Sequence, residues 1–485
     1  MEITIPPEKA ALPLCMDDAM AAKLQQFAKE ALQNGKSYAA CTLPIDLVDP
    51  LSCLHKSWNK EKFHYYWEKP TENFAITAGN ELLNLHAKGK NRFASISQQC
   101  QEIDRQTAVF KGAPHAYGGL ILLGGFSFFQ HIEHPQWKGF DAASFTIPEW
   151  LVFKDDKYAL TTINVEIKDT DSTSVLCDRI ITKFKQIEDR LLQARNHSFN
   201  NTALPTSKGS FVPNHPSSAS ESWVSSVNQA KTLISQNEFD KIVLARQLSI
   251  PHKGQQQAPR VLHNLRNHYF NCSCFLIHPP GGNIFLGATP ENLGSFHNNL
   301  ILTEALAGSI ERGSTPQEDA MFANNLNGSN KNRAEHGFVV QDIRQRLEPL
   351  TNTIKHGLQP QIKKLSNVQH LHTPIRAHLA DGISPLQAVE HLHPTPAVGG
   401  FPREKAMHYI QQLERFERGW YAGPVGWMTP SGSGEFSVAI RSGLLCEEEA
   451  HFFAGCGIVA DSDPNMEWNE TKLKLSPMLS ALNYD

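Results

Sequence analysis

Apolar and polar residues alternate along residues 241–250, a pattern that predicts a β-strand with one buried face. The apolar side chains at even positions fall on one side of this strand, and Lys241, Val243 and Ala245 fall on the other. Further strands are expected at 63–67, 74–77, 118–128, 163–167, 272–277, 284–286, 300–303, 434–441 and 451–453.

Helices are expected at 182–195, 223–236, 333–350, 403–416 and 466–482. Strands and helices follow one another in irregular order, with strand pairs and no repeated βαβ unit, which predicts an α+β fold with antiparallel sheets. A polar stretch rich in Ser, Asn and Pro, residues 196–222, is typical of a linker. We therefore expect an N-terminal α+β region, residues 1–200, that packs on a catalytic domain, residues 215–485.

The composition is that of an ordinary globular protein: 485 residues, 40% hydrophobic and 19% charged, with a formal net charge of -4. This balance gives no sign of binding to nucleic acid or to an anionic membrane. The start of the chain lacks the features of a signal peptide, and its longest apolar stretch, 120–129, is too short to span a bilayer. Nine cysteines without a Cys-x-x-Cys pair favour reduced thiols in the cytoplasm.

Glycines, carboxylates and an ammonium group occur together near the C-terminus. Glu467, Glu470 and Lys474 are spaced by three and four residues, so they share one face of the expected helix. Two carboxylates one turn apart suit a hard divalent cation, and a glycine turn at Gly455 and Gly457 lets backbone amides approach an anion. Taken alone, the same spacing is also common on a solvated helix with one Glu–Lys pair.

Lys241 and Glu291 are candidates for a general base and a general acid. Lys241 begins an apolar strand, where partial loss of hydration favours the neutral amine, although a lysine snorkelling from a strand end is the alternative. Glu291 follows Thr289-Pro290, which can cap and open a helix. Glu291 is then either a capping carboxylate or an acid held at the end of a strand.

Glu335 lies one turn before Phe338 and Val339 on an expected apolar stripe, so we expect it to point inward. An inward carboxylate needs an ion-pair partner or a metal ion. Residues 303–309 are expected to end a strand in a turn of small residues, and 393–400 to form a rigid turn.

Arg441 follows a strand and offers a bidentate clamp for a carboxylate. Together, these candidates describe a site for a small dianionic substrate, with carboxylates for a metal, glycine amides, one lysine base and one glutamic acid. The chain contains no Walker motif, no dinucleotide-binding fingerprint and no G-x-S-x-G serine elbow.

In this combination the chain resembles the chorismate-utilising enzymes, and among them the isochorismate synthases most closely. The motifs that carry the resemblance are Lys241–Arg246, Gly287–Glu291, Glu304–Ser309, Glu335–His336, His393–Gly400, Tyr421–Trp427, Ala439–Arg441, and Ala454–Val459 with Glu467, Glu470 and Lys474. The first half of the chain matches more loosely, through 66–68 and 124–128, and such a leading half is typical of menaquinone-type isochorismate synthases.

The resemblance implies a Mg²⁺ ion held by Glu335 and Glu470, with Glu467 acting through water. It implies that Lys241 activates water for attack at C2 of chorismate and that Glu291 protonates the departing C4 hydroxyl. The residues that it implies for substrate binding are Gly308, Ser309, His393, Ala397, Tyr421, Arg441, Gly455, Gly457 and Lys474.

The fold implied is that of anthranilate synthase component I, two stacked antiparallel β-sheets flanked by helices, in a monomer or homodimer. The implied function is reversible, Mg²⁺-dependent conversion of chorismate to isochorismate, for menaquinone or for siderophore synthesis. Lys241 favours water over ammonia as the nucleophile, and Ala397 stands where salicylate synthases tend to carry threonine. A salicylate synthase that releases pyruvate and a non-catalytic chorismate-binding subunit are the alternatives.

Overall fold

The computed structural model describes residues 17–482 except 113–114, 116, 198, 200–216, 253, 255–256 and 365–367. Most of the expected linker, and the division expected between residues 200 and 215, therefore lie outside the described residues. The helices are α1 (Asp18–Gln33), α2 (Pro50–Ser57), α3 (Arg92–Gln106), α4 (Thr173–Arg195), α5 (Ser217–Ser235), α6 (Ala258–His268), α7 (Pro316–Gly328), α8 (Asn330–Leu347), α9 (Pro385–Leu392), α10 (Arg403–Leu413) and α11 (Pro464–Ala481).

The strands are β1 (Tyr38–Ile45), β2 (His64–Lys69), β3 (Phe74–Ala87), β4 (Thr107–Lys111), β5 (Leu122–Phe126), β6 (Ala143–Lys154), β7 (Ala159–Glu166), β8 (Lys241–Pro251), β9 (Ser273–His278), β10 (Ile284–Thr289), β11 (Asn292–His297), β12 (Leu300–Glu311), β13 (Thr351–His356), β14 (Gln361–Lys364), β15 (Val368–Leu379), β16 (Gly400–Phe401), β17 (Pro424–Met428), β18 (Gly434–Val438), β19 (Ser442–Leu445) and β20 (Glu449–Ile458). Every helix and strand range predicted from the sequence is present, although the ends differ.

Several helices begin where a short polar side chain accepts hydrogen bonds from the first free backbone amides. Asp17, Ser172, Thr315, Ser384 and Asp463 cap α1, α4, α7, α9 and α11 in this way. In α7, α9 and α11 the cap is followed by proline, whose missing N–H costs nothing at this position. These local signals fix the helix starts before any packing.

Hydrogen bonds join the described strands into one continuous ladder. Its order is β16-β8-β20-β19-β10-β9-β2-β3-β6-β5-β17-β18-β11-β12-β15, with β13 and β14 both paired to β15 and a branch from β6 through β7 and β1 to β4. Among these pairs only β1–β4 is parallel. The α+β prediction with antiparallel strands is confirmed.

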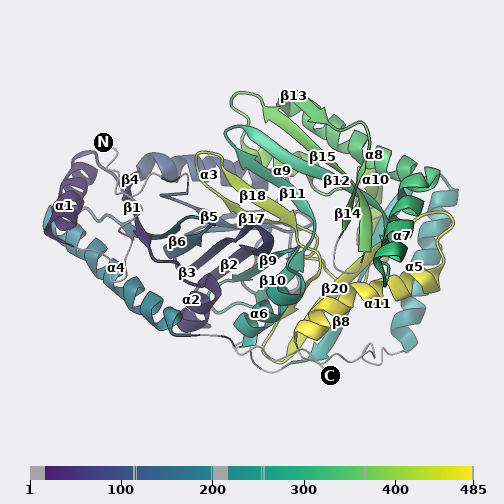
Figure 1. The fold of residues 1–485 in the computed structure, drawn as a ribbon, viewed down its shortest axis with the longest axis horizontal. Helices are drawn as coiled ribbons and strands as arrows, with labels where there is room; N and C mark the ends of the chain where they lie inside the picture. Colours follow the sequence, from purple (N-terminus) through teal and green to yellow (C-terminus); the bar gives the residue numbers. More distant parts are fainter. Residues whose placement is uncertain are drawn as a thin grey trace.

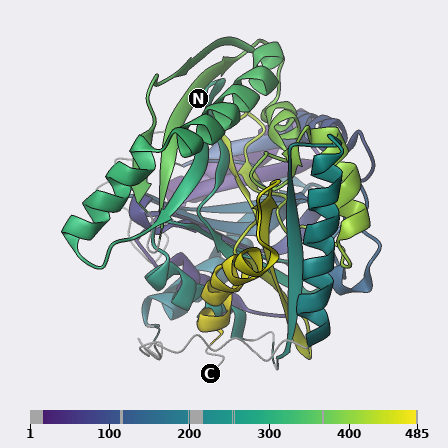
Figure 2. The ribbon, with the colours of Figure 1, turned by 90° about the vertical axis from the view of Figure 1, so that its right-hand side faces the viewer.

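The ladder folds back on itself, so that the two sheets expected from the sequence are two layers of one sheet (Figures 1 and 2). Two contacts tie β2 to the opposite layer: the Tyr65 hydroxyl donates to the Gly426 carbonyl oxygen (2.9 Å), and Lys69 Nζ lies 3.3 Å from Glu435 Oε2. The main hydrophobic cluster lies between the layers and includes Trp67.

Helices cover the outside of both layers. At the right of Figure 1, α11 packs on β20 and α5, whereas α8 lies against β12 and β15 above it. At the left, α4 contacts α1 and α2 and closes a second hydrophobic cluster. This arrangement brings the start of β8 and the end of β20 next to α8 and α11 on one side of the molecule.

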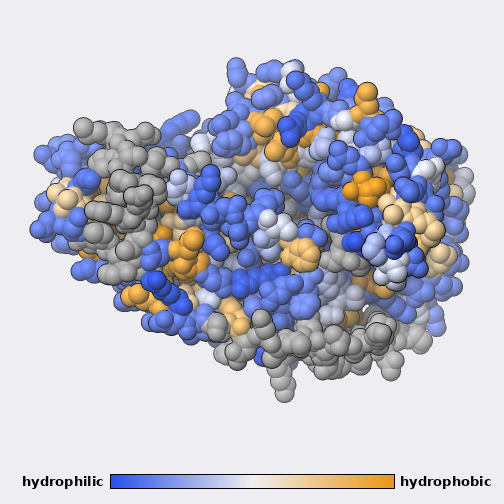
Figure 3. Space-filling view, viewed as in Figure 1, coloured by the Kyte–Doolittle hydropathy of each residue, from blue (hydrophilic) through white to orange (hydrophobic). Residues whose placement is uncertain are grey.

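The face drawn in Figure 3 is mostly hydrophilic, with small and separate hydrophobic patches. Among the described residues, no helix combines the length and the apolar character needed to cross a bilayer.

Replacing Tyr65 by phenylalanine should lower the free energy of unfolding by about 1 kcal/mol, because the hydrogen bond to Gly426 across the two layers is lost. The measurement is chemical denaturation of both proteins. As a control, the same change at the more exposed Tyr158 should leave the stability nearly unchanged. An unaffected Tyr65→Phe protein would contradict a contribution of this contact to the stacking of the layers.

Candidate active site

Glu291 lies in the short link between β10 and β11, which is held by the end of β18. Thr289 donates its hydroxyl to the Val438 carbonyl oxygen (2.6 Å), and the Val438 amide donates to the Glu291 carbonyl oxygen (3.0 Å). The chain turns directly into β11 after Pro290. The prediction of a helix that begins at Pro290 is therefore wrong. Glu291 is instead an acid held at the end of a strand, the alternative that the sequence left open.

Glu291 is half-buried as a residue, and polar groups lie around its carboxylate. The Thr395 hydroxyl donates to Glu291 Oε1 (3.1 Å). Burial raises the pKa of Glu291 to about 7 and nearby Glu304 adds to the rise, while Thr395 and the ammonium groups of Lys474 and Lys241 oppose it. A carboxyl group with this pKa is about half protonated at pH 7, so it can serve as a general acid near neutral pH.

Lys241 is the first residue of β8 and points towards α8. Its Nζ atom lies 3.2 Å from Glu335 Oε1, and its side chain is 22% exposed. The two expected catalytic side chains therefore come from different segments, Lys241 from β8 and Glu291 from the β10–β11 link, and they lie within electrostatic reach of each other.

The apolar face of α8 is turned relative to the expected stripe. Phe338 is 68% exposed, whereas His336 and Val339 are buried. A hydrogen bond between His336 Nε2 and Thr373 Oγ1 (2.8 Å) fixes this rotation against β15. Glu335 is consequently 43% exposed, and the expectation that it points into the core is wrong.

The start of α11 carries the predicted row of charged side chains. Asp463 accepts hydrogen bonds from two amides of the first turn, as expected of a cap. Glu470 Oε1 lies 2.7 Å from Lys474 Nζ, which also donates to the Gly455 carbonyl oxygen (2.9 Å). The shared face of Glu470 and Lys474 is thus confirmed, and Glu467 precedes Glu470 by one turn.

The glycines expected to form a turn lie within β20 instead, where both pair with β8. Gly455 presents its carbonyl oxygen to Lys474. A Cβ atom at Gly457 would lie 2.7 Å from Lys241 Cε, so the glycine leaves room for the lysine chain. The prediction of a turn is wrong because β20 continues its pairing with β8 as far as Ile458.

Arg441 follows β18 in a left-handed backbone conformation (φ 52°). Burial lowers the pKa of Arg441, and nearby Tyr421 and Glu470 oppose this effect. No hydrogen bond or ion pair joins its guanidinium group to another described residue, so the group is available for a carboxylate of a ligand. Tyr421 is buried and stacks on Phe453, with ring centroids 5.1 Å apart.

Strand β12 continues through the stretch where a turn was expected, because its pairing with β15 absorbs the extra residue as a β-bulge. Gly308 lies at this bulge with φ 72°, a conformation that favours glycine. Ser309 Oγ lies 2.8 Å from His370 Nδ1. Burial lowers the pKa of His370 to about 4 and nearby Arg441 and Lys474 reinforce the shift, so this imidazole is neutral at pH 7.

His370 was not recognised in the sequence, whereas His393 was expected beside the substrate. His393 is buried, and its Nε2 atom lies 3.1 Å from the Phe128 carbonyl oxygen. The turn that begins at His393 instead reaches the acid through Thr395, and Ala397 in the same turn is exposed.

Glu304 is the carboxylate that helps to raise the pKa of Glu291, and two side chains hold it in turn. Lys363 Nζ donates to both of its oxygens (2.7 and 2.8 Å), and His372 Nε2 lies 2.7 Å from Oε2. Against the effect of burial, these contacts lower the pKa of Glu304 and keep it ionised. Of the two carboxyl groups, Glu291 is therefore the one that can donate a proton.

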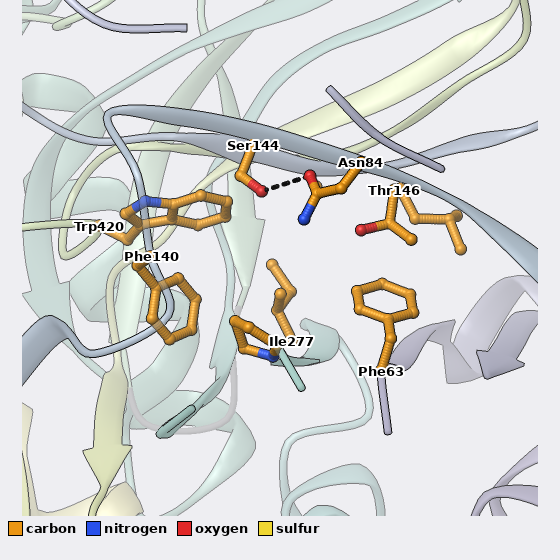
Figure 4. A pocket seen from close by; sticks show the side chains of 10 residues that line it. Phe63, Asn84, Phe140, Ser144, Thr146, Ile277 and Trp420 are labelled. Atoms are coloured by element: carbon orange, nitrogen blue, oxygen red, sulfur yellow. Dashed lines mark hydrogen bonds between the residues drawn. The ribbon is translucent and has the colours of Figure 1, made fainter. Parts of the chain in front are cut away.

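A small cavity lies elsewhere, between the two layers (Figure 4). Phe63, Phe140 and Trp420 line it, and the Ser144 hydroxyl donates to Asn84 Oδ1 (3.1 Å) at its edge. It has room for about one water molecule. None of the expected site residues lines this cavity, so it is not the candidate active site.

The three glutamates expected to bind a metal supply the oxygen donors that Mg²⁺ prefers. Glu335 pairs with Lys241 and Glu470 with Lys474. Within the described part of the chain, no three His, Cys, Asp or Glu side chains are placed to share one metal ion. The oxygen donors of the three glutamates fit Mg²⁺ chemically, but with Glu335 and Glu470 paired to lysines the three side chains do not form a three-ligand site in this structure.

The site as a whole combines a carboxyl group of raised pKa, a lysine, an available guanidinium and half-exposed carboxylates, which defines an acid–base enzyme for a small anionic substrate.

The model of the family described as "Chorismate binding enzyme" matches residues 22–483. The chain is 37% identical to the salicylate biosynthesis isochorismate synthase of Pseudomonas aeruginosa, covering 92% of this chain and 90% of that protein. It is 32% identical to the isochorismate synthase MenF of Bacillus subtilis, covering 90% and 92%. The chain belongs to the family of chorismate-binding enzymes.

Solved structures agree on the fold. The menaquinone-specific isochorismate synthase MenF from Escherichia coli superimposes with a TM-score of 0.74 at 24% identity, covering 96% of this chain and 100% of that chain. Anthranilate synthase component I from Streptococcus pneumoniae superimposes with a TM-score of 0.67 at 22% identity, covering 84% and 92%. The predicted fold class and the predicted family are confirmed.

Replacing Thr395 by valine should raise the pKa of Glu291 above its value of about 7, because the hydrogen bond that stabilises the ionised carboxylate is lost. The measurement is a pH titration of the carboxyl carbon by NMR in protein labelled at glutamate. Serine at position 395 retains the hydroxyl and should restore the original midpoint. An unchanged midpoint in the valine protein would show that Thr395 does not contact the acid in solution.

Proposed function

We propose that this chain catalyses the reversible conversion of chorismate to isochorismate. The observation that carries the proposal is Glu291, whose raised pKa keeps a proton available within reach of Lys241. The relatives that cover most of the chain are named as isochorismate synthases, which supports the same reaction. A subunit that only binds chorismate would not require an acid and a base in one site.

In this reaction, water forms a bond to C2 of the substrate ring while the bond between C4 and its hydroxyl group breaks. Lys241 accepts the proton that the attacking water loses, and Glu291 donates a proton to the departing hydroxyl group. Water is both consumed and released, so the atoms balance. The two side chains come from separate segments, β8 and the β10–β11 link, which allows them to act at different positions of one flat ring.

The substrate carries two carboxylates, and the site offers cationic groups for both. Arg441 has an available guanidinium group. Lys474 lies on α11 beside Gly455. We propose that these two residues bind the carboxylates, with Ser309 and Tyr421 at the edge of the same site.

We propose that Glu335 and Glu470 hold Mg²⁺ directly and that Glu467 holds it through water. When bound, Mg²⁺ supplies positive charge that neutralises a substrate carboxylate. Glu335 is 43% exposed and Glu470 is 50% exposed, so neither needs to leave the core to reach a metal ion. When Glu335 binds the metal ion it separates from Lys241. The lysine is then free to accept the proton of the attacking water.

We also propose a cytoplasmic enzyme that acts as a monomer or homodimer. All cysteines that the structure describes are free thiols, as expected in a reducing compartment. The similar proteins include isochorismate synthases named for salicylate biosynthesis, for menaquinone and for vibriobactin. The proposal therefore covers the formation of isochorismate and not its later use.

Incubation of the purified protein with chorismate and Mg²⁺ should give a mixture of chorismate and isochorismate without pyruvate, and EDTA should stop the reaction. Chromatography of the products and an assay for pyruvate make the measurement. Salicylate with an equal amount of pyruvate would contradict the proposal in favour of a salicylate synthase. Absence of any turnover would favour a binding subunit.

Replacing Glu470 by glutamine should raise the Mg²⁺ concentration needed for half-maximal rate by about 10-fold or more, because one charged oxygen ligand is lost. The check is a titration of the rate with Mg²⁺. Glu449, an exposed glutamate at the start of β20, provides a matched control, and its change to glutamine should leave the titration unaltered. An unaltered titration for Glu470→Gln would remove Glu470 from the metal site.

A further inference from the structure

The turn at residues 393–400 touches the proposed acid, Glu291, and the strand that begins with the proposed base, Lys241. At one end, the Thr395 hydroxyl donates to Glu291 (3.1 Å). At the other end, the Val243 amide donates to the Gly399 carbonyl oxygen (2.9 Å), and Gly400 pairs with β8 directly after Lys241. The position of this turn relative to β8 therefore sets the position of the acid relative to the base.

Arg418 is hydrogen-bonded both to the turn at 393–400 and to β8. One terminal nitrogen, Nη1, donates to the Val398 carbonyl oxygen in the turn (2.8 Å). The other, Nη2, donates to the Val243 carbonyl oxygen in β8 (2.8 Å). The guanidinium plane also lies over the ring of Phe128, 4.2 Å from its centroid, and Phe128 in turn holds His393 at the start of the turn.

Glu414 completes the arrangement. Its oxygens accept from Arg418 Nε (2.8 Å) and Nη2 (2.6 Å), and Oε1 also accepts from the Ala245 amide in β8 (2.7 Å). The side chains of Arg418 and Glu414 are only 1% and 3% exposed. Both charges are thus removed from water, and Arg418, Glu414 and β8 satisfy one another's hydrogen bonds.

We propose that Arg418 and Glu414 are positioning residues that lock the turn carrying Thr395 to the strand carrying Lys241, and so set the geometry between acid and base. The proposal rests on the function proposed above. Neither side chain touches the acid or the base, so each acts through the backbone it holds.

Stability alone does not call for this pair. Two buried charges lose their hydration, and apolar residues of similar size often stabilise a fold equally well. What apolar side chains cannot do is bind two carbonyl oxygens and an amide in fixed directions, as the planar guanidinium and its carboxylate do here. A positioning role accounts for these directional hydrogen bonds to the backbone, which a role in stability alone does not require.

The first test is Arg418→Lys, which keeps the charge and loses the planar fork. We expect kcat to fall by about 100-fold with KM nearly unchanged, because a displacement of about 1 Å between reacting groups has this effect. The NMR titration of Glu291 should shift upward, as expected for loss of the Thr395 contact. A kcat and a titration both like those of the original protein would overturn the proposal.

The second test separates positioning from folding. Arg418→Met leaves Glu414 buried without its partner and should lower Tm strongly. The double change Arg418→Met with Glu414→Leu removes both charges and should restore much of Tm, while kcat stays low. Recovery of kcat together with Tm would show that the pair serves only to stabilise the fold.

Arg266 and Asp49 offer a matched control, because they also form a bidentate pair (2.8 and 3.0 Å) but join α6 to the start of α2. Arg266→Lys should leave kcat unchanged in the folded enzyme. If the unaltered protein does not convert chorismate, the proposed function fails. The Glu291 titration in Arg418→Lys still decides whether Arg418 positions Thr395.

Discussion

The buried ion pair of Arg418 and Glu414 is the constraint on which the rest of the site depends. A charge that leaves water must find every hydrogen-bond partner inside the protein, and here those partners are the backbone of β8 and of the turn at 393–400. Satisfying one side chain therefore fixes two segments that are distant in the sequence. Lys241 belongs to the first of these segments, and Thr395, which contacts Glu291, belongs to the second. The buried ion pair therefore sets the distance between the base and the acid.

The active site is assembled at the edge of the folded sheet from elements that contribute one function each. The acid comes from the β10–β11 link, the base from β8, and the carboxylates proposed for Mg²⁺ come from α8 and α11. Four groups of the site already form ion pairs inside the protein, Lys241 with Glu335 and Lys474 with Glu470. Under the proposed function, exchange of these partners for substrate and Mg²⁺ would free the reactive groups without a change of fold.

Much of this could be predicted from local sequence. The alternation in β8, the cap of α11 and the Glu470–Lys474 spacing depend on neighbouring residues, and the motifs identified the family. The errors arose where tertiary contacts decide. Pairing with β8 kept Gly455 in a strand, and a bond to Thr373 turned α8 so that Phe338 faces solvent.

Two residues of the site were not recognised for related reasons. His370 and Thr395 acquire their roles from partners, Ser309 and Glu291, that are more than sixty residues away in the chain. Nothing local distinguishes His370 from its neighbours in β15, where alternation indicates only which side of the strand it occupies. The strand pairing that carries Ser309 to His370 becomes visible only in the folded sheet.

The most direct measurement is the fate of solvent oxygen in a single turnover. If Lys241 activates water while Glu291 releases the C4 hydroxyl group, isochorismate formed in water labelled with ¹⁸O should contain one labelled oxygen at C2, seen by mass spectrometry. Isochorismate without the label would mean that the hydroxyl group moves within the substrate, and it would contradict the division of roles between base and acid.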